Sequence, residues 1–154
     1  MAWKNKRKLI FIILWALVLI LVLSFVWRLI FKGPGKAELV MVKGREMRLE
    51  TVSDAAGMYR GLSGRQSLCL DCGLIFNFPG SAPRHFTMRG MMFPLDIVFL
   101  NQGRVAAILQ NLPPDPPGQA SDYPGPDSDQ VLEINAGRAE SLGLEVGDVL
   151  ELPR

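Results

Sequence analysis

An uninterrupted apolar run near the amino terminus restricts what this chain can fold into. From Leu9 to Trp27, nineteen consecutive residues carry no charge. As a helix that rises about 1.5 Å per residue, the run is just long enough to cross a bilayer core of about 30 Å. Trp3 and Trp27 bracket it, where aromatic side chains favour the membrane interface. The sequence therefore predicts a single transmembrane helix over residues 9–31.

The residues that flank this run predict how the chain is placed. A cleaved signal peptide is the alternative, but residues 24–31 are bulky, whereas a cleavage site needs small residues. Four basic residues precede the run and three follow it, which favours an amino terminus in the cytoplasm. We expect a single-pass protein of the cytoplasmic (inner) membrane, with a basic cytoplasmic tail (1–8), a linker (32–37) and an extracytoplasmic domain (38–154).

The charge is divided unevenly along the chain. Residues 1–36 hold seven Lys or Arg and no acid, whereas the remaining residues hold ten Lys or Arg against fifteen Asp or Glu, a formal balance of −5. Nucleic-acid binding needs a concentrated basic face, so this net acidic part is a poor candidate for it. Intrinsic disorder is also disfavoured, because 49% of the chain is hydrophobic.

Strand and turn signals dominate after residue 37. Alternating apolar and polar residues, separated by Gly-containing turns, predict short strands. Two short helices are expected at 54–59, capped by Ser53, and at 136–142, capped by Asn135. The pattern fits an all-β fold, a small β-barrel or sandwich with one or two short helices. The expected strands are 38–43, 47–52, 74–78, 85–88, 97–100, 105–109, 131–134 and 149–152.

One stretch interrupts this pattern. Residues 113–127 contain six prolines and two glycines. Proline cannot donate to a strand ladder, so we predict a long loop over 111–130 instead of a central strand. Tyr123 is its only aromatic residue and is therefore a candidate for contacting a partner.

Several motifs occur in the order typical of one bacterial and archaeal family. They are Arg60-Gly61-Leu62 with Arg65, then 73–76, 86–100, 131–137 and Gly147-Asp148. In these motifs the chain resembles the domain of unknown function 192 (DUF192) family over most of residues 38–152. The resemblance implies a compact β-rich domain, commonly behind a signal or anchor, with no established reaction. The chain departs from the family at Thr87 and Met91, and in having Cys69 and Cys72.

Asp96 lies among apolar residues, so its carboxylate is expected to be buried. A buried, unpaired charge costs several kcal/mol by the usual estimates, so a cationic or hydrogen-bonding partner is required. Arg60, Arg65 and Arg89 are the candidate partners. Either a structural salt bridge forms, or Arg60 and Arg65 make an anion-binding pair, oriented by Asp96 and Glu133 and suited to a carboxylate or phosphate.

The same two acids also allow an enzymatic interpretation. Asp96 and Glu133 could serve as general acid and base in a hydrolase if they lie about 5 to 10 Å apart. Other catalytic motifs, such as G-x-S-x-G and the Walker sequence, do not occur in this sequence.

Cys69 and Cys72 are the only cysteines. Outside the cytoplasm they are expected to form a disulfide. The alternatives are a metal site completed by His85 and a carboxylate or by a second chain, or a redox-active dithiol. His85 also lies within eight residues of three methionines, a combination that suits Cu(I), although core packing explains the methionines as well.

These patterns together predict a non-enzymatic binding or accessory domain held at the membrane through residues 9–31. Its expected partner is a small anionic ligand or a protein, without nucleic acid and without a cofactor. The expected binding residues are Arg60, Arg65, Asp96 and Glu133. A metal or redox module built on Cys69 and Cys72, and a hydrolase built on Asp96 and Glu133, remain the alternatives.

Overall fold

The computed structural model describes residues 13–25 and 37–154, and these two parts are considered separately. Residues 13–25 form a helix in which every residue is exposed. No helix within the described ranges is long and apolar enough to cross a membrane. Much of the predicted span, at residues 9–12 and 26–31, lies outside the described residues, as do the predicted tail and nearly all of the linker.

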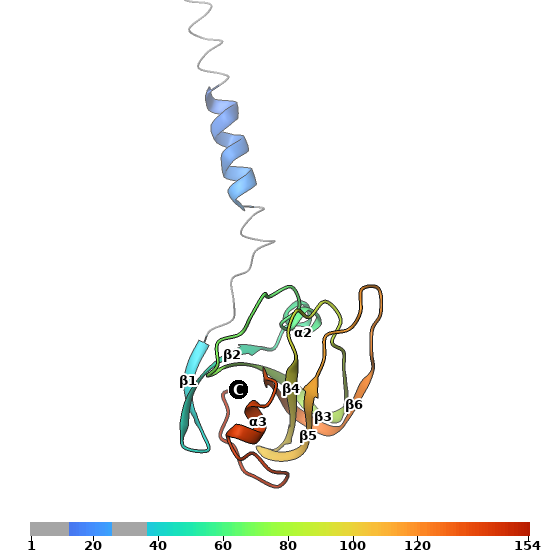
Figure 1. The fold of residues 1–154 in the computed structure, drawn as a ribbon. Helices are drawn as coiled ribbons and strands as arrows, with labels where there is room; N and C mark the ends of the chain where they lie inside the picture. Colours follow the sequence, from blue (N-terminus) through green and yellow to red (C-terminus); the bar gives the residue numbers. More distant parts are fainter. Residues whose placement is uncertain (1–12, 26–36) are drawn as a thin grey trace, which may run out of the picture. The chain divides into compact units, whose positions relative to one another are not determined.

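The folded domain is built on one six-stranded mixed sheet (Figure 1). The strands follow the order β1-β2-β3-β6-β4-β5, and every neighbouring pair is antiparallel except β2 and β3, which run parallel. The predicted mostly-β fold with short helices is thus confirmed. The strands are β1 (Ala37–Val42), β2 (Arg45–Val52), β3 (Cys72–Phe86), β4 (Leu95–Asn101), β5 (Arg104–Leu112) and β6 (Tyr123–Asn135).

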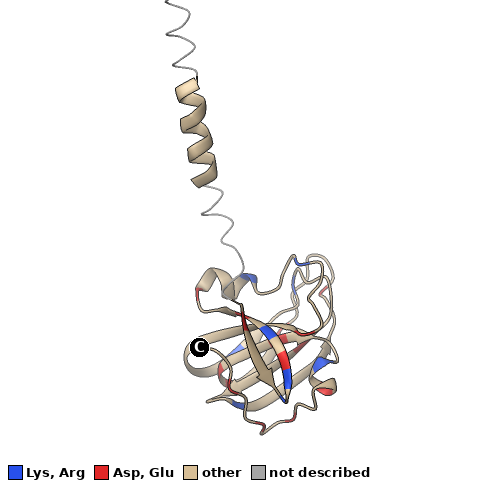
Figure 2. Cartoon of the chain, turned by 90° about the vertical axis from the view of Figure 1, so that its left-hand side faces the viewer, with Lys and Arg blue, Asp and Glu red and all other residues tan. Residues whose placement is uncertain are grey.

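Two-residue turns close the outer hairpins of the sheet. Lys43 and Gly44 join β1 to β2, and Gln102 and Gly103 join β4 to β5, all four with positive φ. Such turns match the right-handed twist of the strands they connect. Basic and acidic residues are mixed along β2 (Figure 2), so this strand carries no continuous basic face.

Side chains alternate between two apolar cores because successive residues of a strand point to opposite faces of the sheet. In β3, Ile75 belongs to one core, and Leu74 and Phe76 belong to the other. In β4, Val98 and Phe99 divide in the same way. Both faces of the central strands are therefore covered, and the second core forms the floor of the cavity described below.

Both short helices are present but differ in detail from the prediction. Helix α2 (Ala55–Arg60) is capped by Asp54, whose carboxylate accepts from the Gly57 amide at 2.9 Å, and not by Ser53. Helix α3 (Arg138–Ser141) is shorter than expected and has no side-chain cap at its N-cap residue, Gly137. The expected last strand at 149–152 is also wrong: its only ladder contact within the described chain is a bridge between Val149 and Arg104.

The two longest strands correct the prediction most. β3 runs continuously through the two segments expected as separate strands, with register shifts between Asn77 and Arg84. β6 begins at Tyr123, so the loop predicted over 111–130 is shorter. Its proline-containing part, residues 123–127, pairs with β3 alone, whereas β4 pairs with 130–135. Proline is tolerated there because that end of β6 is a sheet edge.

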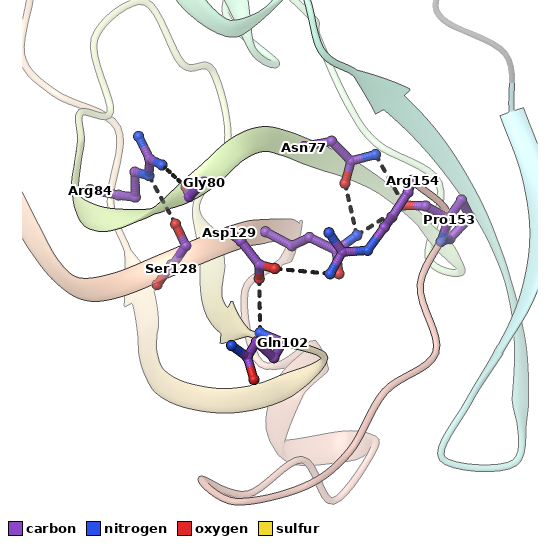
Figure 3. A network of polar contacts seen from close by, with 9 residues as sticks. Asn77, Gly80, Arg84, Gln102, Ser128, Asp129, Pro153 and Arg154 are labelled. Atoms are coloured by element: carbon purple, nitrogen blue, oxygen red, sulfur yellow. Dashed lines mark hydrogen bonds and ion pairs between the residues drawn. The ribbon is translucent and has the colours of Figure 1, made fainter.

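The carboxyl-terminal residues are bonded to β3 and β6 (Figure 3). The Asn77 and Gln130 amides donate to the Pro153 carbonyl at 3.1 and 3.0 Å. Arg154 pairs with Asp129 at 2.9 Å, and the Asp129 carboxylate also accepts from the backbone N–H of Gln102 at 3.0 Å. These contacts fasten the end of the chain to the middle of the sheet.

Candidate functional site

A cavity of about 440 Å³ lies against the second core. Its walls come from α2 and the turn that follows it, from the second half of β3, and from the segment after β3. The floor contains Glu133 of β6. Its apolar lining includes Met58, Leu62, Phe76, Phe78, Phe86 and Met91, and its basic lining is Arg60, Arg84, His85 and Arg89.

The wall beside α2 depends on a sharp turn at Gly61. This residue has a φ of 51° and a ψ of −130°, a conformation that side-chain-bearing residues rarely adopt. A Cβ there would lie 3.4 Å from Phe76 Cζ and 3.6 Å from Glu133 Oε2. Further along, the Ser63 hydroxyl donates to the Arg89 carbonyl at 2.9 Å and the Gly64 amide to the Gly90 carbonyl at 2.9 Å. These bonds join the turn to the segment after β3.

Glu133 is the most unusual group in the cavity. It lies on β6 between two apolar residues and is only 5% exposed. Among the described residues, its Oε2 atom has no hydrogen-bond partner. Burial raises the pKa of this carboxyl to about 8, although the positive charge of Arg65 acts in the opposite direction. A buried oxygen without a hydrogen-bond partner costs free energy, so a further hydrogen bond to Glu133 would be favourable.

The predicted pair of Arg60 and Arg65 is not formed. Arg60 ends α2 and lines the cavity. Arg65 instead makes two hydrogen bonds of 2.7 Å to the carboxylate of Glu50 on β2. This bidentate contact raises the pKa of Arg65 and commits its guanidinium to Glu50.

Three arginines line the cavity without a carboxylate partner in the described chain. None of the ion pairs there involves Arg60, Arg84 or Arg89. The Arg89 guanidinium lies 4.7 Å from the centre of the Tyr59 ring, and that of Arg84 lies 3.9 Å from the centre of the Phe78 ring. Cation–π contacts of this kind hold a guanidinium in place without neutralising it.

Backbone contacts fix the position of Arg84 further. Its Nε donates to the Ser128 carbonyl at 3.0 Å, and a second nitrogen donates to the Gly80 carbonyl (Figure 3). His85, the fourth basic residue of the lining, is instead paired with Asp122 at 2.8 Å. The net positive charge in the cavity therefore comes from arginine.

Asp96 is fully buried, as predicted, but it is bonded to backbone and not to arginine. Its carboxylate accepts from the backbone N–H groups of Asn111 at 2.8 Å, Gly137 at 3.1 Å and Ala139 at 2.8 Å. Asp96 thus takes the place of a capping side chain at the start of α3 and anchors β5 beside it. The expectation that Asp96 pairs with Arg60, Arg65 or Arg89, or orients an anion-binding pair, is wrong.

The structure does not bring Asp96 and Glu133 together as a catalytic pair. In the β4–β6 ladder, Asp96 faces Ile134 and Ile97 faces Glu133. Residues at successive positions of a strand point to opposite faces, so the two carboxylates lie on opposite sides of the sheet. A shared cleft is the condition for acid–base hydrolysis, and the sheet separates these two groups.

Cys69 and Cys72 form a disulfide, with Cα atoms 5.1 Å apart. The Asn135 side chain donates to the Cys69 carbonyl at 2.9 Å, which holds the turn against β6. Between the cysteines, Asp71 pairs with the buried guanidinium of Arg138. Within the described ranges no three metal-ligating side chains are grouped, and His85 lines the cavity with a different partner.

Sequence reasoning named Arg60 and Glu133 but missed most of the cavity lining. Arg84 was not a candidate, because residues 79–83 contain glycine and proline and read as a break between strands, and no motif singled out Phe78 or Tyr59. The available signal was the alternation of Phe76 and Phe78, which places both rings on one face of β3.

The family comparison agrees with the motifs in the sequence. A family model described as "DUF192: Uncharacterized ACR, COG1430" matches residues 38–152. The resemblance predicted from the ordered motifs is thus confirmed. None of the curated proteins is significantly similar to this chain.

Two crystal structures share the fold. One is a protein from Sinorhizobium meliloti described as a "putative transcription regulator", with 28% identity and a TM-score of 0.69 over 78% of this chain and 96% of that chain. The other is a protein of unknown function from Novosphingobium aromaticivorans, with 32% identity and a TM-score of 0.65 over 75% of this chain and 83% of that chain.

Proposed function

Since the chain belongs to the DUF192 family over residues 38–152, we propose that this domain is a non-enzymatic module that binds a small organic anion in the cavity above Glu133. The observation that carries the proposal combines two features of the described residues: three arginines that form no ion pair with an acid there, and a buried carboxyl oxygen that has no hydrogen-bond partner there. The buried oxygen is costly while it lacks a partner, and guanidinium groups that form no ion pair favour an anionic ligand.

The charge of the ligand follows from the arginines. Arg60, Arg84 and Arg89 face one cavity, and guanidinium groups that lack a carboxylate partner attract a carboxylate or phosphate. Contacts with Tyr59 and Phe78 hold two of them in place, so little side-chain entropy is lost when the anion binds.

The organic body of the ligand follows from the rest of the lining. Phe76, Phe78 and Phe86, together with Met58 and Met91, give the cavity apolar walls. A cavity of about 440 Å³ falls within the usual range of small-molecule sites, roughly 300 to 1,000 Å³. An inorganic anion alone would leave these walls uncovered, so the ligand combines an anionic group with an apolar or aromatic part.

A matched pair of probes tests this proposal by calorimetric titration of the full chain in a mild detergent. 3-Phenylpropionate carries the anionic group, and 3-phenylpropan-1-ol has the same body without the charge. We expect the acid to bind at least about tenfold more tightly than the alcohol, which corresponds to about 1.4 kcal/mol. Arg60→Gln and Arg89→Gln should each reduce that preference.

Arg45→Gln is the matched control, because Arg45 is an exposed residue of β2 outside the cavity. It changes the net charge by the same amount and should leave the preference intact. Equal affinity for acid and alcohol, or an equal effect of all three substitutions, would overturn the proposal.

We also propose that residues 9–31 anchor the domain to the cytoplasmic membrane, with the amino terminus inside. The uncharged run from Leu9 to Trp27 supports this, and so does the disulfide, since disulfides persist mainly in oxidising compartments. In intact cells, a membrane-impermeant thiol reagent should label Cys69 and Cys72 only after reduction. Labelling that needs opened cells and no reductant would contradict this placement.

Nucleic acid is not among the partners that we propose. The net charge of residues 37–154 is negative, and basic and acidic residues are mixed on the strands (Figure 2). Binding to a nucleic-acid phosphate backbone requires a continuous basic face. A domain with a net negative charge and mixed charges on its strands is poorly suited to this.

A further inference from the structure

The proposed contacts with the arginines do not say which part of the ligand faces the Glu133 carboxyl. The arginines lie in the walls formed by α2, β3 and the segment after β3, whereas Glu133 comes from β6 at the floor. An anionic group held by Arg60 and Arg89 in the walls leaves the floor of the cavity to the rest of the ligand. Glu133 therefore needs a different part of the ligand.

The surroundings of Glu133 determine what that part is. Leu132 and Ile134, its neighbours along β6, point to the other face of the sheet, whereas the ring of Phe76 lies on the same face as Glu133, near the Gly61 turn. Among the described residues no donor reaches Oε2. The carboxyl of Glu133 is thus a nearly buried polar group beside the apolar lining of the cavity, without a described donor at Oε2.

We propose that the ligand is a hydroxylated organic acid, with its anionic group at the arginines and a hydroxyl at its inner end hydrogen-bonded to Glu133. This inference rests on the proposed function, since it places the anionic end at the same arginines. It adds the specificity element: Glu133 distinguishes a hydroxylated acid from the same acid without the hydroxyl.

A hydroxyl fits the floor better than an ammonium group. Three arginines that form no ion pair within residues 37–154 line the cavity, and Arg65 also acts on Glu133 through its charge. A second cation would be repelled by all four, whereas a hydroxyl is neutral. A hydroxyl both donates and accepts, so it can pair with a carboxyl group in either protonation state.

The expected discrimination is large for a single atom. An acid without the hydroxyl would place an apolar group against Glu133 and leave the buried carboxyl without any partner. Sites built around a buried polar group discriminate strongly against analogues that lack its complement. We expect a preference of about tenfold or more for the hydroxylated acid.

The test compares 3-(4-hydroxyphenyl)propionate with 3-phenylpropionate on the full chain. The wild-type protein should prefer the hydroxylated acid by about tenfold. Glu133→Leu should lose this preference while it still binds both acids, because the arginines are unchanged. Glu133→Gln should keep a preference, since an amide also donates and accepts.

The Leu variant is expected to fold, because no described residue donates to Oε2 and the substitution leaves no donor to it without a partner. If it does not fold, Glu133→Met replaces it in the same comparison. Equal affinities in the wild-type protein, or a preference that persists in the apolar variants, would overturn the inference. A lack of binding by both acids would overturn the proposed function instead, so the two failures are distinguishable.

Discussion

Gly125 lies directly against the ring of Phe99. A Cβ at position 125 would come within 2.1 Å of Phe99 Cε1. Phe99 in turn meets Phe86 edge to face at 5.7 Å, and Phe86 meets Phe76 in the same way at 5.2 Å. Because residue 125 has no side chain, there is room for the Phe99 ring, and the rings of Phe99, Phe86 and Phe76 pack in a row that reaches the cavity.

Gly125→Ala should destabilise the domain, because the added methyl group overlaps Phe99. We expect a loss of about 1 to 3 kcal/mol in the free energy of unfolding, the usual range for overpacking a core. Urea unfolding measures it. Gly80→Ala is the control, because a Cβ at residue 80 meets nothing within 4 Å. An equal loss in both variants would mean that the Phe99 contact is not the cause.

Asp96 should be essential for stability and not for ligand binding. In the wild-type protein, the backbone N–H groups of Asn111, Gly137 and Ala139 donate to the Asp96 carboxylate. Asp96→Asn places an NH₂ donor against these donors. We expect a loss on the order of 3 kcal/mol in the free energy of unfolding. Asp127→Asn makes the same chemical change on the exposed part of β6 and should cost little. A stable Asp96→Asn protein would refute this role.

Glu133 should make stability depend on pH in a direction that is unusual for an acid. Burial raises its pKa to about 8, so the folded protein holds a proton that the unfolded chain releases from about pH 4.5 upward. Stability should therefore fall as the pH rises through this window. Glu133→Gln cannot ionise and lacks this loss.

The stability difference between Glu133→Gln and the wild-type protein is the quantity to measure. It should increase between about pH 5 and pH 8 by a few kcal/mol, on the order expected from the shift, and should level off above that. Because other groups titrate equally in both proteins, they cancel in the difference. A difference that is constant with pH would show that Glu133 ionises normally.

The disulfide should contribute modestly to stability. It closes a loop of four residues, for which the loop-entropy model gives about 2 kcal/mol. The hydrogen bond from Asn135 to Cys69 remains after reduction and limits the effect. Reduction should thus lower the unfolding free energy without unfolding the domain. A Cys69→Ser, Cys72→Ser double variant is the control and should not respond to the reductant.

The burial of Asp96 could be predicted, but its partners could not. Apolar neighbours on both sides of Asp96 indicate a buried position in a strand. The amides that bond to it are up to 43 residues away along the chain, and every residue except proline carries such a donor. The negative charge of Asp96 suggested an arginine partner. In the structure its partners are backbone N–H groups, two of them at the start of α3.

The proline-rich segment shows a second limit of sequence reasoning. Its prolines exclude a strand with neighbours on both sides, and that part of the prediction agrees with the ladder. The sequence did not reveal that β6 would have only one neighbour over 123–127. Arg84 therefore remained unassigned, because it lies between the expected strands 74–78 and 85–88, which are one strand in the structure.

Methyl NMR of the methionines tests the central claim, that the cavity above Glu133 binds a small organic anion. Met58 and Met91 line the cavity, whereas Met41 is exposed on β1. In the full chain with labelled methionine methyl groups, added 3-(4-hydroxyphenyl)propionate should shift the Met58 and Met91 signals saturably and leave Met41 unchanged. If Met58 and Met91 do not respond, or if all three signals drift together without saturation, the cavity is not the binding site that we propose.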